Sequence, residues 1–125
     1  MTRLQKLTLL YGLVIAVLII LANVGYLPMA RLMRILPYSD KLGHFFLIGF
    51  FGLFVNLSLS CRQWGIFLVG SLVVGTFATL EEFSQLYSIH RTFDWGDLTA
   101  DYAGLFLFGI FARRICSKTS KNYHN

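Results

Sequence analysis

Charged side chains are scarce in this chain of 125 residues, where they make up 14% against 56% hydrophobic residues. A soluble globular domain carries roughly 25% charged residues. So few charges cannot cover a water-facing surface, and the shortage argues against an ordinary soluble domain. The composition therefore predicts an integral membrane protein, organised as one unit over residues 1–125.

Acidic residues are absent from the first 39 and the last 24 positions. Five of the six carboxylates lie between Leu80 and Gly104, and the sixth, Asp40, opens a second polar patch that ends at His44. Charged groups in membrane spans are costly and usually face a bundle interior or a watery cavity. We therefore expect the function to lie where these two patches meet.

The sequence also lacks several signatures of known sites. Its two cysteines, Cys61 and Cys116, provide neither a disulfide framework nor a metal-binding spacing, and they are interpreted as small apolar side chains. No G-x-S-x-G or H-E-x-x-H motif is present to support a hydrolase. The net charge of +5 comes from basic residues that flank apolar runs rather than forming a continuous face, which excludes a nucleic-acid site.

Four apolar stretches predict four transmembrane helices, and hence an all-α membrane bundle. The first has no small-residue cleavage pattern after it and is interpreted as a retained helix rather than a signal peptide. The helices are expected at Leu7–Val24, about Asp40–Ser60, Trp64 to about Leu86, and about Trp95–Ala112. Between Pro28 and Pro37, helical spacing fits a short helix on the membrane surface, and an ordinary loop with anchoring arginines fits equally well.

Local signals refine these helices. Ser39 or Asp40 can cap the second helix, and Asp94 and Asp97 can cap the fourth. Small residues recur every four positions in the third helix and again in the fourth, which predicts close helix contacts in a bilayer. These positions are Ser71, Gly75 and Thr79, and then Ala100 and Gly104.

Basic residues predict the orientation. The two ends and the turn at Arg62 carry seven Lys or Arg residues, against four in the other two loops. The positive-inside rule then places both termini in the cytoplasm. On that side both cysteines should stay reduced. The polar groups of the second, third and fourth helices would share the outer face of the bacterial cytoplasmic (inner) membrane.

These polar residues resemble those of the VanZ-like family of small bacterial membrane proteins. The early match is Asp40-Lys41-x-x-His44-Phe45, and the later match is Glu82-x-x-Gln85 followed by Arg91-x-x-Asp94-x-x-Asp97-x-x-x-Asp101-x-x-Gly104. Together they cover residues 40 to 104. One departure is Asp101, where the family usually has Asn, so a role that needs an amide donor does not carry over. The resemblance implies an envelope-associated membrane protein, with a link to teicoplanin-type glycopeptide resistance.

The candidate residues receive separate roles. His44, Glu82 and Asp97 are candidates for acid–base catalysis. The resemblance favours Glu82 rather than Glu81 as the inward residue, and Gln85, one turn later, can hydrogen-bond to it. Arg91 is expected to be the counter-charge of the acids. A structural ion-pair cluster joining the third and fourth helices explains the same residues equally well. The candidate binding residues are Asp40, Lys41, Gln85, Arg91, Asp94 and Asp101.

Three classes of function fit the sequence. The first is an envelope factor that binds a lipid-linked cell-wall intermediate or a drug. The second is a membrane-embedded hydrolase or transferase on a lipid-linked substrate, using acid–base chemistry or a divalent metal held by the carboxylates and His44. The third is a small ion-coupled transporter, since intramembrane carboxylates suit one. The sequence names no cofactor, metal or oligomeric state.

Overall fold

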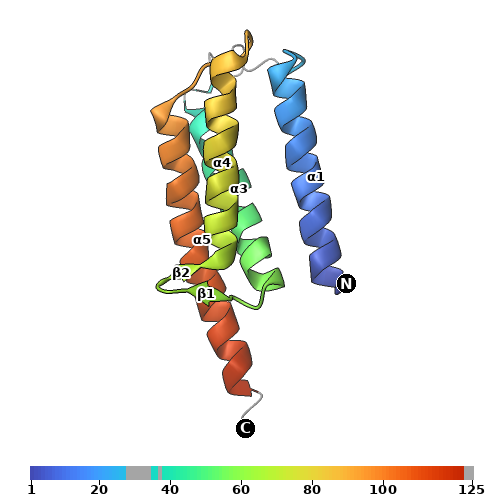
Figure 1. Ribbon diagram of the computed structural model, residues 1–125, viewed down its shortest axis with the longest axis vertical. Coiled ribbons are helices and arrows are strands. Elements are labelled where there is room, and N and C mark those ends of the chain that lie inside the picture. The colour runs from blue at the N-terminus through green and yellow to red at the C-terminus, as the bar shows by residue number, and fades with distance from the viewer. Residues whose placement is uncertain (28–34, 37, 123–125) are drawn as a thin grey trace.

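The computed structural model of the chain describes residues 1–27, 35–36 and 38–122. This part consists of helices, apart from one short β-hairpin, and confirms the all-α expectation in outline (Figure 1). The expected surface helix between Pro28 and Pro37 lies largely outside the described residues. The elements are α1 Arg3–Asn23, α3 Ser39–Ser58, β1 Gln63–Trp64, β2 Phe67–Leu68, α4 Val69–Ser84, the 3-10 turn η1 Gln85–Tyr87 and α5 Trp95–Asn122.

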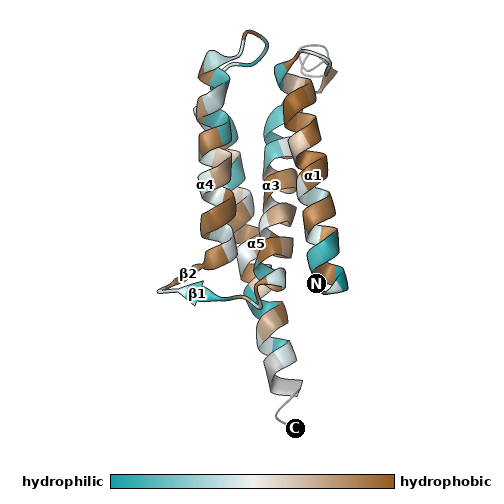
Figure 2. Cartoon of the chain, turned by 45° about the vertical axis from the view of Figure 1, so that its right-hand side comes forward, coloured by the Kyte–Doolittle hydropathy of each residue, from teal (hydrophilic) through white to brown (hydrophobic). Residues whose placement is uncertain are grey.

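Two of these helices, α1 and α3, are long and apolar enough to cross a membrane. The apolar window of α1 has a mean hydropathy of 2.2, yet only 11% of it is buried against the rest of the chain. Most of α1 is coloured hydrophobic in Figure 2, and its exposed side chains include Leu9, Leu13 and Ile20. A core helix of a soluble protein would instead be covered by its neighbours.

The third helix begins later than expected, at Val69 rather than Trp64. Residues before it form a hairpin in which Trp64 pairs with Phe67 across a two-residue loop. Gly65 opens that loop at φ +59°, a backbone conformation that glycine adopts without steric cost. The guanidinium of Arg113 donates to the Ile66 carbonyl and ties the hairpin to α5.

The last helix is longer than expected, because α5 continues past Ala112 to Asn122. Its 28 residues give a length of about 42 Å. Figure 1 shows its carboxyl end projecting beyond the hairpin.

The closest helix contact is between α3 and α5, and it depends on glycine. A Cβ atom on Gly104 would overlap the Phe45 carbonyl oxygen and lie 3.3 Å from the Gly49 Cα. A Cβ on Gly49 would overlap the Phe108 ring. Backbones approach this closely only where small residues line the interface, so the expected role of Gly104 in a close contact is confirmed.

Replacing Gly104 with alanine is expected to destabilise the protein by about 1–3 kcal/mol, because the added methyl group meets backbone that cannot move aside. Thermal unfolding of the purified protein measures this effect. The matched control is Gly43→Ala. Gly43 lies on α3, and an added Cβ atom there would have no atom of another element within 4 Å. Equal melting temperatures for the two variants would contradict the close packing described above.

The small stripe of α4 makes the close helix contacts that were expected, with Gly75 and Thr79 against α5 and Ser71 against α3. Thr79 and Tyr102 share a hydrogen bond of 2.9 Å between their hydroxyl groups, and a Cβ on Gly75 would lie 3.2 Å from the Tyr102 ring. At the far end of the bundle the buried Asn56 of α3 bonds Ser71, accepting from its N–H at 3.0 Å. These contacts fix α4 against both neighbours.

The first helix lies at the edge of the bundle (Figure 1). It packs against α3, where the Thr8 and Ser58 hydroxyl groups lie 2.7 Å apart and the Tyr11 hydroxyl donates to the Leu47 carbonyl. No such close packing joins α1 to α4 within the described residues. This arrangement leaves a cavity on the side of α1 that faces the bundle.

The two cysteines form a disulfide, Cys61–Cys116, between the end of α3 and the carboxyl-terminal part of α5. The prediction that they are separate, reduced side chains is wrong in this structure. The pairing could not be predicted from the spacing of the two cysteines, because they are 55 positions apart and meet only when α3 and α5 are packed.

Candidate functional site

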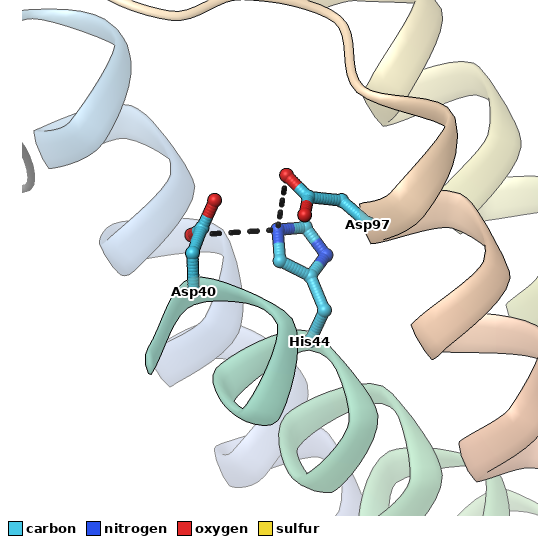
Figure 3. Close-up of side chains that lie close together, drawn as sticks. All are labelled: Asp40, His44 and Asp97. Atoms are coloured by element: carbon cyan, nitrogen blue, oxygen red, sulfur yellow. Dashed lines mark ion pairs between the residues drawn. The ribbon is translucent and has the colours of Figure 1, made fainter. Parts of the chain in front are cut away.

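His44 is the centre of the polar cluster at the end of the bundle opposite the disulfide. Its Nδ1 lies 3.1 Å from Asp101 Oδ1, within hydrogen-bond distance. Its Nε2 lies 3.9 Å from Asp40 Oδ1 and 3.9 Å from Asp97 Oδ2. Figure 3 shows Asp40 and Asp97 approaching this one ring nitrogen from two different helices.

Helix geometry brings these four side chains together. Asp40 and His44 are one turn apart on α3, and Asp97 and Asp101 are one turn apart on α5, so each pair shares a face. The glycine contact between Gly49 and Gly104 holds the two faces against each other. The prediction that Ser39 or Asp40 caps α3 is wrong, because the N-cap of α3 is Tyr38 and no side chain caps that end.

Lys41 supplies the counter-charge that we had expected from Arg91. Its Nζ donates to Asp94 Oδ2 at 2.6 Å and to Asp97 Oδ1 at 2.9 Å. The hydrogen bond from Lys41 to Asp94, with a second from the Gly96 N–H to the same carboxylate, holds the pKa of Asp94 below its ordinary value. Asp94 thus caps α5 as predicted, whereas Asp97 points into the cluster.

Arg91 makes no ion pair in the part of the chain that the structure describes. The expectation that it pairs with Asp94, Asp97 or Asp101 is wrong. Instead Arg91 lines a cavity beside Asp101 and Glu81. Its guanidinium can therefore bind a ligand in the cavity, because it forms no ion pair with the described residues.

Glu82 is the inward-facing glutamate, as predicted, with none of its surface exposed. Its Oε1 accepts from the Asp94 N–H at 2.8 Å and its Oε2 accepts from Gln85 Nε2 at 2.9 Å. Gln85 also donates to both carboxylate oxygens of Glu81, each at 3.2 Å. This second group of polar residues anchors the loop after α4 to the start of α5.

A cavity of about 260 Å³ opens next to His44. Its walls are mostly apolar and come from α1, α3 and α4, including Ile19 and Ala78. One end is polar. The polar lining residues are Ser39, Asp40, His44, Glu81, Arg91 and Asp101.

The sequence did not identify the contribution of α1 to this cavity. Ile15, Leu18, Ile19 and Ala22 form one of its walls, although α1 carries no polar candidate. Ser39 and Glu81 were also not assigned to the site. A second cavity, of about 420 Å³ between the hairpin and α5, has Arg113 as its one charged lining residue and lies away from the cluster.

The arrangement supports two kinds of chemistry. An imidazole with a carboxylate on one nitrogen and two carboxylates near the other can exchange a proton or join a metal site. An apolar cavity with a polar end suits an amphiphilic ligand. No protein-family model, curated protein or solved structure matches the chain.

Proposed function

We propose that the chain is a VanZ-like integral membrane protein with four spans, whose outward-facing polar site binds a lipid-linked envelope intermediate. Its role in the envelope would include tolerance of teicoplanin-type glycopeptides. The observation that carries the proposal is the cavity beside His44, which joins an apolar wall from α1 to a cluster of ionisable side chains.

The lengths of the helices are compatible with four spans. The 16 residues of α4 extend about 24 Å, which is shorter than a hydrocarbon core of about 30 Å. The hairpin before α4 and η1 after it extend this segment toward each interface. Large apolar side chains are exposed along the helices, among them Leu13, Val73 and Phe106, and lipid would cover them.

The cavity suits a lipid better than a soluble ligand. Its apolar part lies between α1 and α4, and α1 packs mainly on α3, so an acyl or prenyl chain could enter sideways between α1 and α4. A headgroup would then meet Asp40, His44, Arg91 and Asp101 at the polar end. The His44–Asp101 contact needs an acceptor oxygen, which either Asp or the Asn usual in the family provides.

Replacing Ile19 with tryptophan is expected to reduce bound lipid at least tenfold, because the larger side chain fills the cavity from its α1 wall. The matched control is Ile20→Trp, the next residue, which is 60% exposed and lies outside the cavity lining. Mass spectrometry of lipid retained by the purified protein, loaded with a radiolabelled polyprenyl phosphate, measures the difference. Equal retention by the two variants would contradict the lipid site.

A membrane-embedded hydrolase or transferase is the second candidate, favoured by the position of His44 between Asp101 and the pair of Asp40 and Asp97. The same retention experiment separates it from simple binding. Conversion of the labelled lipid to a product, lost in His44→Ala but not in Ile20→Trp, would assign catalysis. Recovery of unchanged lipid assigns a binding role.

A further inference from the structure

The polar end of the bundle has more negative than positive groups. All six Asp and Glu side chains lie there, and the cationic side chains among them are Lys41, Arg91 and His44. Three of the acids, Glu82, Asp97 and Asp101, are at most 2% exposed. Buried carboxylates repel one another and lose hydration, so this excess calls for a further positive charge.

We propose that Asp40, His44 and Asp97 form a binding site for a divalent cation, Zn²⁺ or Mn²⁺. One ligand atom from each of the three lies within 4.8 Å of the other two. His44 Nε2 is 3.9 Å from an oxygen of each aspartate, and two atoms at that separation can both lie about 2.1 Å from one ion. A set of one imidazole and two carboxylates suits these ions.

The surroundings of the three ligands fit a metal centre. Asp101 contacts His44 Nδ1 at 3.1 Å and so orients Nε2 toward the two aspartates. Histidine ligands in metal sites regularly have a carboxylate on the other nitrogen. Asp97 is held by Lys41 through Oδ1, which leaves Oδ2 facing His44.

Through the cavity an ion can reach the three ligand residues, and a ligand can reach the ion. Asp40 and His44 line it, so an ion held between them has open coordination positions on the cavity side. In this respect the inference rests on the proposed function, because those positions would bind the phosphate oxygens of a lipid headgroup. Without a cation, the surrounding carboxylates would repel such a headgroup.

Calorimetric titration of tag-free protein, stripped with a chelator, tests the site with ZnCl₂ or MnCl₂ alone. We expect one ion per chain, binding that is at least 100-fold weaker in His44→Ala, and binding 10–100-fold weaker in Asp101→Ala through loss of the acceptor that orients His44. The matched control is His90→Ala, an exposed loop histidine, which should bind as the wild type does.

No binding by the wild type at 1 mM, or equal affinity in His44→Ala, would overturn the site. If His44→Ala does not fold, X-ray absorption of the loaded wild type decides, because a shell without one imidazole nitrogen would equally overturn it. Lipid retention by the stripped and by the ion-loaded protein separates the two proposals. Retained lipid with no ion site refutes the cation alone, whereas an ion-loaded protein that retains no lipid refutes the proposed function.

Discussion

Replacing Glu82 with alanine is expected to remove most of the folded protein from the membrane. Its two carboxylate oxygens accept from the Asp94 N–H and from Gln85 Nε2, and all of the side chain is buried. Truncation leaves the Asp94 N–H without that acceptor, at a cost of about 1–3 kcal/mol. It also removes one acceptor of Gln85 Nε2, which keeps its contacts to Glu81. The cavity left behind adds to the loss. Together these approach the 5–15 kcal/mol that holds a typical domain folded.

The yield of folded protein and its melting temperature measure this effect. The neighbouring Glu81→Ala is the matched control, because Glu81 is only partly buried and its bonds to Gln85 are longer, at 3.2 Å. Glu82→Gln keeps an acceptor for the Asp94 N–H and should recover part of the stability. A Glu82→Ala protein that melts with the wild type would show that this buried carboxylate is dispensable for the fold.

The parts of the site that depend on helix periodicity could be predicted from the sequence. The spacing of Asp40 and His44 placed both on one face, and the one-turn offset of Glu82 and Gln85 predicted their hydrogen bond. The choice of Glu82 over Glu81 as the inward residue came from the family resemblance and was correct. The small stripe through Gly75 makes a close helix contact, as expected. In each case the residues that matter lie within one or two turns of each other.

The parts that depend on packing between distant segments could not be predicted. Lys41, rather than Arg91, neutralises Asp94, and this depends on how the start of α5 sits against α3. The contribution of Ile19 to the cavity follows from how α1 packs beside α3 and α4, which no apolar run encodes. The hairpin at Gly65 was missed because its residues are as apolar as those of a helix start.

A phosphatase fused after Asn125 is expected to be inactive in cells, and a fluorescent protein at the same place to be bright, because the basic ends favour a cytoplasmic location. The disulfide argues against a cytoplasmic location of the same end of the bundle. Cys61 and Cys116 lie at the basic end of the bundle, and disulfides persist mainly in oxidising compartments. The two arguments agree only if the bond forms after the cells are broken and the cysteines are exposed to air.

We therefore expect both cysteines to react with a membrane-permeant maleimide added to intact cells, and to be linked after purification in air. The mass of the intact protein counts the maleimide groups, and Cys61→Ser is the control that leaves one reactive thiol. A bond already present in trapped cells, together with an active phosphatase fusion, would reverse the orientation. His44 and its carboxylates would then face the cytoplasm, and the ligand would have to be sought on the inner leaflet.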